Sequence, residues 1–424
     1  MNTGMKIAII GAGSSYTPEI VEKLVELKDE LPVRELAFMD IDPARMETVA
    51  GFCRRFMKHL GHEIPLHTGT DRRKAIEGAR FVITQIRVGL NAQRILDEKI
   101  PLKYGIIGQE TTGPGGMFKA LRTIPAMLEI AHDVQAVAPE AWIINYTNPT
   151  GLVAEAVTRY SQARIAGLCS GVFFPRQAVC EALSVPPEAV DYDYFGLNHL
   201  NFAYNLRLHG RPLSEAEFER VLEEAAGDSV ELGLLQALRL VPSPYLQYYF
   251  QRSKKVRLAL GKPTTRGEDV LELEKEVFAA YADPSQVVKP AALARRGGGG
   301  YSEIALGIIQ AISADQDRVF IVNVPNRGAV HGLPDEAVLE IPCLVNASGI
   351  FPLAVPEVPR SVWGLIAAVK NYEQLVVEAA VSGSRQKALL ALMAHPLVSD
   401  YDLAAPMLEE MLNANRLYLP RFFP

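Results

Sequence analysis

Apolar and polar residues along the first half of the chain form a pattern that predicts strands and helices in turn. The run Ile7-Ala8-Ile9-Ile10 predicts a buried strand, and Thr17-Pro18-Glu19 opens an amphipathic helix after a glycine-rich turn. Further short apolar runs and helical repeats predict strands at 35–42, 81–86, 141–147 and 164–169 and helices at 43–60 and 116–134. Such alternation is typical of a parallel, doubly wound α/β sheet.

The pattern changes near residue 192, where two antiparallel strands are predicted at 192–197 and 201–208. Long helical stretches follow at 215–226, 229–261, 268–282 and 301–314, the second broken at Pro242 and Pro244. Strands return at 319–324 and 338–345, and three helices are expected between 359 and 417. We therefore predict a Rossmann-like domain at 1–191 and a second, α+β domain at 192–424, an architecture like that of lactate and malate dehydrogenases.

Composition narrows the class of protein. The 424 residues are 49% hydrophobic and 22% charged, as in soluble globular proteins, and the net charge of −6 argues against nucleic acid as a partner. No apolar run reaches the length of a signal peptide core or a membrane span, so we expect a cytoplasmic protein without a membrane partner. The four cysteines show no CxxC or disulfide-like spacing.

The glycine-rich turn after the first strand predicts a dinucleotide site. Gly11, Gly13, Ser14 and Ser15 lie between a strand and a helix, where backbone N–H groups and the helix N-terminus attract a diphosphate. The usual third glycine is missing, and a tight turn in an ordinary α/β domain is the plainer interpretation. Asp40, at the end of the next predicted strand, stands where a ribose-binding carboxylate belongs, which favours NAD over NADP.

Polar or soft residues also follow later strands, at the edge where doubly wound sheets bind ligands. They are Arg87, the segment 145–148, and Cys169. Cys169 and His199 could share a divalent ion that chelates sugar oxygens, although their spacing alone does not make them a metal pair.

Placed next to Arg87 and Arg94, Glu110 and Thr111 of the loop 108–116, GQETTGPGG, would put a carboxylate in a basic neighbourhood, as a site for a phosphorylated polyol needs. The stretch Arg295-Arg296 followed by four glycines has two interpretations, a mobile loop or a basic clamp on an anionic ligand.

These motifs together resemble family 4 of the glycoside hydrolases, in its 6-phospho-β-glucosidase branch. The resemblance covers nearly the whole chain. Its motifs are GAGSSYTPE (11–19), IRVG (86–89), RILDEKIPLKYGIIGQETTGPGG (94–116), NYTNPTG (145–151), GLC (167–169), GLNHL (196–200), PYLQYY (244–249), RRGGGGYS (295–302) and VNVPNRG (322–328).

The resemblance implies NAD as a catalytic cofactor and a divalent ion, usually Mn²⁺, on Cys169 and His199. The implied reaction on a phosphorylated disaccharide or β-glucoside begins with oxidation at carbon 3. Removal of the carbon 2 proton, elimination of the aglycone, addition of water and re-reduction follow. The resemblance also implies a homodimer or homotetramer.

By the same resemblance, Arg94 and Asn148 match substrate-contacting positions, and Arg87 and Arg296 are candidates for the 6-phosphate. Glu110 matches an acidic residue that tunes the base.

Two departures from the family pattern affect the catalytic residues. Ser170 follows the metal cysteine, where the family usually has Asn or Asp, and a serine is a poor proton donor. The tyrosine base is expected upstream of PYLQYY, at a position that aligns near Leu235. Tyr245, less readily Tyr248, or else His199 or a metal-bound hydroxide would then act as the base.

Two alternative functions follow from these departures. One is an NAD-dependent sugar-phosphate oxidoreductase or epimerase, and the other is a catalytically silent binder of NAD and sugar phosphate. The aglycone, the gluco- or galacto-configuration and the need for a 6-phosphate are left open.

Overall fold

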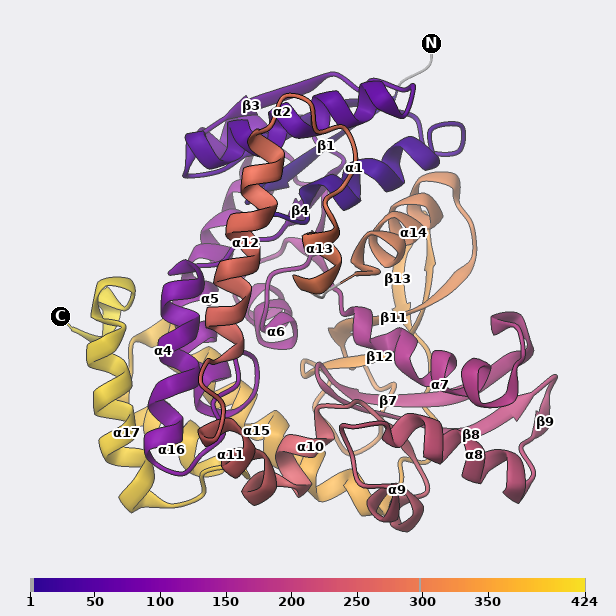
Figure 1. Cartoon of the computed structure of the whole chain (residues 1–424), viewed down its shortest axis with the longest axis vertical. Helices are drawn as coiled ribbons and strands as arrows, with labels where there is room; N and C mark the ends of the chain where they lie inside the picture. Colours follow the sequence, from indigo (N-terminus) through magenta and orange to yellow (C-terminus); the bar gives the residue numbers. More distant parts are fainter. Residues whose placement is uncertain (1–3, 297–298, 424) are drawn as a thin grey trace.

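The computed structural model describes residues 4–296 and 299–423, and its main feature is a nine-stranded sheet covered by helices. A smaller four-stranded sheet, labelled β7 and β8 in Figure 1, lies beside it. The large sheet has the order β13-β12-β11-β6-β5-β4-β1-β2-β3. Its strands are β1 Met5–Ile10, β2 Val33–Met39, β3 Leu66–Gly69, β4 Phe81–Thr84, β5 Trp142–Asn145, β6 Arg164–Gly167, β11 Arg318–Pro325, β12 Val338–Asn346 and β13 Gly349–Pro352.

The first six strands confirm the predicted doubly wound sheet. They pair in parallel in the order 3-2-1-4-5-6, which is that of dinucleotide-binding folds, and the order reverses between β1 and β4. Because crossovers between parallel strands are right-handed, the reversal leaves a crevice beyond the carboxyl ends of these two strands. β1 is buried at every position, which explains its continuous apolar run.

The helices around the sheet form two groups. α1 Thr17–Glu26, α2 Pro43–His59 and α14 Tyr301–Ala314 lie together, and α5 Gly113–Val137, α6 Thr150–Tyr160 and α15 Arg360–Ser382 form the second group. Further helices are α3 Arg72–Ile76, α4 Leu90–Lys103, α7 Phe174–Leu183, α8 Glu215–Ala226, α12 Arg266–Ala282, α13 Ala291–Arg296, α16 Arg385–Ala394 and α17 Tyr401–Ala414. The chain also has short 3-10 turns, η1 Ser170–Phe173, η2 Pro187–Ala189, η3 Arg416–Tyr418 and η4 Pro420–Phe422. The three predicted closing helices are α15, α16 and α17.

The small sheet corrects one prediction. The two antiparallel strands are present as β7 Val190–Leu197 and β8 Leu200–Leu208. The short strand β9 Arg211–Pro212 pairs with the C-terminal end of β8. The helical stretch expected at 229–261 is broken at the predicted prolines, but the break contains an element that was not predicted, because α9 Leu232–Leu238 is followed by a short strand, β10 Val241–Pro242, which pairs with β8. Proline lacks the N–H that a helix interior requires, so two short helices, α10 Leu246–Phe250 and α11 Arg252–Leu260, follow only after Pro244.

Strands from both sides of residue 191 contribute to the large sheet, since β11 pairs with β6 and β12. The proposed division at 191 and 192 stays a prediction. In Figure 1, α12 lies beside α4 and extends upward to α2, near the turn that follows β1. Within residues 4–296 and 299–423, no helix is long and apolar enough to cross a membrane.

Candidate active site

A single cavity of about 1480 Å³ is lined by most of the residues that were predicted from the sequence to form the site. It extends from the turn after β1, past the ends of β4, β5 and β6, to the turn between β7 and β8. The predicted residues that line it are Gly11, Gly13, Ser14, Asp40, Arg87, Arg94, Glu110, Asn148, Cys169, Ser170, His199, Tyr245 and Arg296. The predicted cofactor, metal and substrate positions therefore share one space.

The two glycines of the nucleotide loop are required by close packing. Gly11 has a φ of +86°, and a Cβ there would lie 2.9 Å from the carbonyl oxygen of Gln85. A Cβ on Gly13 would lie 2.9 Å from Oδ2 of Asp40. The loop thus passes directly against its neighbours and exposes its backbone to the cavity.

Asp40 holds this loop in place. Its Oδ2 accepts a hydrogen bond from the N–H of Gly13 at 2.9 Å, and its Oδ1 accepts from the N–H of Asp42 at 3.1 Å. Asp42 itself caps α2 by accepting from Arg45. Of this acidic pair, Asp40 contacts the turn, as its place beyond β2 would require of a ribose-binding residue.

Ser15 differs from the other predicted cofactor residues. Its side chain is fully buried and does not line the cavity, and its backbone oxygen accepts a hydrogen bond from the hydroxyl of Tyr281 at 2.8 Å. Ser14 does line the cavity. Tyr16, which stands near the usual third glycine, lies under the guanidinium of Arg296, 4.4 Å from ring centroid to Cζ.

Cys169 and His199 form the predicted metal pair, and both are buried at the cavity wall. Sγ of Cys169, two residues beyond β6, accepts a hydrogen bond from the N–H of Gly171 at 3.3 Å. His199 has a φ of +65° in the turn between β7 and β8, and its Nδ1 lies 2.7 Å from Oγ1 of Thr111. Burial raises the pKa of the Cys169 thiol and lowers the pKa of His199 to about 4.

The donor set fits a divalent cation with open coordination positions. No hydrogen bond in the described part of the chain engages Nε2 of His199, so the neutral imidazole keeps a free lone pair. A soft thiolate and an imidazole suit a transition metal, and metal binding favours the deprotonated thiol that burial alone disfavours. Among residues 4–296 and 299–423, no group of three or more His, Cys, Asp or Glu side chains could hold a metal ion.

Tyr245 lies flat against His199. The two rings are 4.0 Å apart and nearly parallel, with an interplanar angle of 6°. Burial and the nearby thiol of Cys169 raise the pKa of the Tyr245 hydroxyl. Leu235, by contrast, is fully buried in α9 and does not line the cavity. Tyr248 also lines the cavity and meets Tyr245 edge to face.

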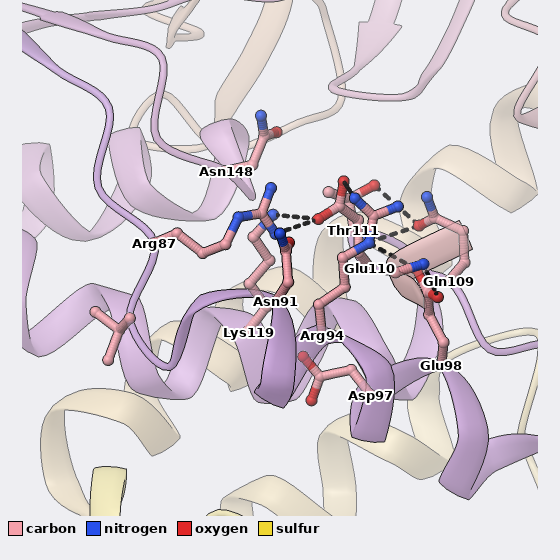
Figure 2. A network of polar contacts seen from close by, with 12 residues as sticks. Arg87, Asn91, Arg94, Asp97, Glu98, Gln109, Glu110, Thr111, Lys119 and Asn148 are labelled. Atoms are coloured by element: carbon pink, nitrogen blue, oxygen red, sulfur yellow. Dashed lines mark hydrogen bonds and ion pairs between the residues drawn. The ribbon is translucent and has the colours of Figure 1, made fainter. Parts of the chain in front are cut away.

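A charged cluster around Glu110 forms the floor of the site (Figure 2). Oε2 of Glu110 accepts hydrogen bonds from Nη1 of Arg87 at 2.7 Å and from Nζ of Lys119 at 2.9 Å, and its Oε1 lies 3.3 Å from Nη1 of Arg94. Burial alone would raise the pKa of Glu110, but Arg87, Lys119 and Arg94 hold it well below its usual range. Glu110 is therefore a carboxylate that three cations fix in position.

Arg94 is held from the other side by Glu98. Its Nε donates to Oε1 of Glu98 at 2.7 Å, and Oε2 of Glu98 accepts the N–H of Gly267 at the start of α12 at 2.7 Å. Helix α12 thereby contributes to the position of a predicted substrate residue.

Asn148 and Arg296 lie on other walls of the cavity. Figure 2 shows Asn148 above the Glu110 cluster with no line joining them, and Oδ1 of Asn148 is buried without a partner in the described part of the structure. Nη2 of Arg296 donates to Oε1 of Glu274 at 2.8 Å, and the buried Nε has no partner among the described residues. Of the predicted basic clamp, Arg296 faces the cavity and Arg295 does not, while residues 297 and 298 lie outside the described residues.

Lys119 is a residue of this site that was not predicted from the sequence. It lies in α5, where its neighbours in sequence are mostly apolar, and its side chain is only 6% exposed. Burial lowers its pKa to about 7, with Glu110 opposing this effect and Arg87 adding to it. The one feature of the sequence that could have indicated Lys119 is that it is a lysine among mostly apolar helical residues, but it belongs to no recognised motif.

Comparisons with known proteins place these features in a family. Residues 6–185 match the model of the family 4 glycosyl hydrolases, and residues 194–398 match the model of the family 4 glycosyl hydrolase C-terminal domain. A probable 6-phospho-beta-glucosidase of Bacillus subtilis is 42% identical over 100% of this chain and 99% of the relative. A 6-phospho-beta-glucosidase of Escherichia coli is 36% identical over 100% and 98%.

Solved structures agree. The 6-phospho-beta glucosidase of Thermotoga maritima with NAD and glucose-6-phosphate superimposes with a TM-score of 0.91 at 36% identity, covering 98% of this chain and 99% of that chain. A second structure of that protein contains manganese, NAD+ and glucose-6-phosphate, with a TM-score of 0.89 at the same identity and coverage. A malate dehydrogenase of Plasmodium falciparum, 13% identical with a TM-score of 0.53 over 89% of this chain and 99% of that chain, shares the fold alone.

Proposed function

The chain belongs to family 4 of the glycosyl hydrolases, and on this premise we propose that it is a 6-phospho-β-glucosidase that depends on NAD and a divalent metal. The curated relatives of Bacillus subtilis and Escherichia coli carry that activity in their names, and the Thermotoga maritima protein has been solved with NAD+, manganese and glucose-6-phosphate. The substrate is accordingly a phosphorylated disaccharide or β-glucoside.

One observation supports this proposal more than any other. The dinucleotide loop, the Cys169 and His199 pair, Tyr245 and the Glu110 cluster line a single cavity. When bound, NAD supplies a hydride acceptor at carbon 3 of the sugar, and the metal supplies a Lewis acid beside it. Two-carboxylate hydrolysis fits poorly, because three cations hold Glu110.

The protein groups then have the following proposed roles. Gly11, Gly13, Ser14 and Asp40 hold NAD, with Ser15 supporting the loop from behind. Cys169 and His199 hold the metal.

The proposed catalytic groups face the same sugar. Tyr245 is our candidate for the base at carbon 2, since it lies against His199 in the cavity whereas Leu235 does not reach it. Its pKa must fall when the site is loaded, which nearby cationic charge favours. Ser170 lies beside Cys169 and would bind the leaving-group oxygen or the incoming water, while Glu110 tunes the charge around the base.

Substrate contacts are proposed for four residues. Arg94 and the unpartnered Oδ1 of Asn148 would bind sugar hydroxyls. Arg87 and Arg296 would contact the 6-phosphate, and each retains N–H donors beyond those given to Glu110 and Glu274.

The test is nitrophenol release from p-nitrophenyl 6-phospho-β-glucoside with NAD, Mn²⁺ and a reductant. We expect release that requires NAD, is lost in Cys169→Ser and persists in Cys180→Ser, since Cys180 lies on α7 away from the cavity. Accumulation of NADH without nitrophenol would instead favour a sugar-phosphate oxidoreductase or epimerase. Binding of NAD and glucose 6-phosphate without either product would favour a silent binder.

Cellular location and assembly belong to this proposal as well. The absence of disulfides among the described cysteines agrees with a reducing compartment, and we propose a cytoplasmic enzyme. The homodimer or homotetramer stays a prediction, which light scattering after gel filtration tests. The net charge of −6 gives no support to a nucleic-acid partner.

A further inference from the structure

Lys119 is a buried cation with spare hydrogen-bonding capacity at the wall of the cavity. An ammonium group has three N–H donors, and in the described part of the structure Nζ makes one hydrogen bond, to Oε2 of Glu110. The side chain is 6% exposed and lines the cavity. Because a buried charge is costly unless it is fully hydrogen-bonded, two unused donors indicate a missing partner.

Arg122, one turn further along α5, shows what a structural cation in this helix looks like. Its Nη1 and Nη2 donate to the two oxygens of Asp97 at 2.9 and 2.6 Å, and Nη1 also donates to Oδ1 of Asn415. Arg122 does not line the cavity. Lys119 is also buried, but it has one hydrogen-bond partner among the described residues and lines the cavity, so a purely structural role does not account for its position.

The chemistry beside Lys119 favours a hydroxyl group as the missing partner. Oε2 of Glu110 accepts hydrogen bonds from Arg87 and Lys119, whereas Oε1 has one cation near it among the described residues, Arg94 at 3.3 Å. The ammonium is therefore a donor placed next to a carboxylate that can still accept. A hydroxyl both donates and accepts, whereas a phosphate only accepts at neutral pH and is repelled by the carboxylate.

The position of this donor and acceptor pair relates it to the predicted metal ligands. Thr111, the residue after Glu110, contacts Nδ1 of His199 at 2.7 Å, so the Glu110 cluster and His199 are neighbours along the wall of the cavity. Figure 2 shows Lys119 and Arg87 directed at Glu110 from the same side, with Asn148 above them.

We propose that Lys119 is a substrate-binding residue whose ammonium, fixed on Glu110, donates hydrogen bonds to ring hydroxyl oxygens of the sugar. This inference rests on the proposed function, because it assigns a contact within the same site. An oxygen that gains negative charge during the reaction would bind the ammonium more tightly, so Lys119 would contribute to turnover as well as to binding. The ligand class is a pyranose 6-phosphate with free ring hydroxyls.

The experiment is titration calorimetry of glucose 6-phosphate with the NAD- and Mn²⁺-loaded full chain. Lys119→Met keeps the length of the side chain and removes its donors, and we expect the dissociation constant to rise roughly 10- to 100-fold. Lys119→Arg should recover part of the affinity, since it restores a cation. The matched control is Lys103→Met, which removes an exposed lysine with one glutamate partner, Glu410, outside the cavity.

Two measurements separate this inference from structural damage. NAD affinity should change less than about twofold in Lys119→Met, and the variant should unfold cooperatively. Unchanged affinity for glucose 6-phosphate in a folded Lys119→Met chain would overturn the inference. An equal loss in NAD affinity would also overturn it, because it would indicate a general disturbance of the cavity.

Turnover separates the inference from the proposed function. If the wild type releases nitrophenol and Lys119→Met does so with the same kcat and KM, the inference fails while the function stands. If the wild type releases none but glucose 6-phosphate binding still depends on Lys119, the function fails while the binding role stands.

Discussion

At the scale of single residues, the orientation of His199 depends on one hydroxyl. Oγ1 of Thr111 donates its proton to Oε1 of Gln109 at 2.9 Å and therefore accepts from Nδ1 of His199 at 2.7 Å. This assignment places the ring proton on Nδ1 and leaves the lone pair of Nε2 for a metal. Thr111 is thus a positioning residue for the predicted metal site.

We predict that Thr111→Val lowers Mn²⁺ affinity by about 10- to 100-fold, because the imidazole loses the group that fixes its tautomer. Thr111→Ser keeps the hydroxyl and should bind the metal with nearly the wild-type affinity. Competition against a chelating dye measures both without any turnover. Equal affinities in the valine and serine variants would show that the hydroxyl has no such role.

The pH dependence of substrate binding gives a second prediction at this scale. Burial lowers the pKa of Lys119 to about 7, against opposition from Glu110 and with help from Arg87 and Arg94. Asp97 and His199 also face this cluster. A bound hydroxyl oxygen favours the ammonium form, so affinity for glucose 6-phosphate should fall as pH rises above about 7.

In Lys119→Met this decline above pH 7 should flatten, while any effect of the substrate phosphate, which titrates near pH 6, persists on the acid side. Calorimetry between about pH 6 and 9, a range that brackets the lowered pKa of Lys119, would detect the difference. A decline of the same size in the methionine variant would assign the titration to another group.

At the scale of elements, the contact between α4 and α12 positions Arg94. A Cβ on Gly267 would lie 3.0 Å from Cγ1 of Ile95 and 3.1 Å from Oε2 of Glu98. Oε2 of Glu98 accepts a hydrogen bond from the N–H of Gly267, and Oε1 of the same carboxylate accepts one from Nε of Arg94. The two helices can approach this closely only because the residue is glycine.

We predict that Gly267→Ala costs about 1–2 kcal/mol of unfolding free energy relative to a neutral glycine replacement, and that it weakens glucose 6-phosphate binding. Gly364→Ala is the matched control, since Gly364 lies inside α15 with no heavy atom within 4 Å of the added Cβ. It should be neutral or stabilising by up to about 1 kcal/mol. Equal denaturation midpoints for the two variants would argue against tight packing at Gly267.

The sequence predicts the elements of this fold better than it predicts their contacts. The helices α8 and α14 begin and end where the sequence pattern predicts, since α8 has an amphipathic pattern and a capping box at Ser214 and α14 is a continuous, mostly apolar run after a glycine. The stretch 229–261 was predicted less well, because Val241 and Pro242 form a strand that pairs with β8, which lies about 40 residues earlier in the sequence. Lys119 shows the same limit for the site, because its meaning comes from Glu110, Arg87 and the cavity rather than from its own neighbours.

At the scale of the whole molecule, Glu274 on α12 joins the nucleotide side of the cavity to the substrate side. Its Oε1 lies 2.8 Å from Nη2 of Arg296 and 3.4 Å from Nη2 of Arg45, and its Oε2 accepts from Nδ2 of Asn91 at 2.9 Å. Nε of Arg45 donates in turn to the backbone oxygen of Gly13 at 2.8 Å. One carboxylate thus connects α2, α4, α12 and α13 around the cavity.

We predict that Glu274→Gln lowers the free energy of unfolding by about 1–3 kcal/mol, because two partly buried guanidinium groups lose their shared counter-charge. It should also reduce the rise in melting temperature that NAD causes. Arg45 fixes the nucleotide loop, and at a given NAD concentration the stabilisation grows with the logarithm of the ratio of that concentration to the dissociation constant. Thermal denaturation with and without NAD measures both effects.

The matched control is Glu272→Gln on the same helix, an exposed residue whose partner is Lys275. An exposed ion pair contributes little, so this variant should unfold within about 0.5 kcal/mol of the wild type and keep the full response to NAD. If Glu274→Gln and Glu272→Gln had the same melting temperature both with and without NAD, Glu274 would not link the two sides of the cavity. A selective loss of the NAD response would instead locate the coupling in the contact from Glu274 through Arg45 to Gly13.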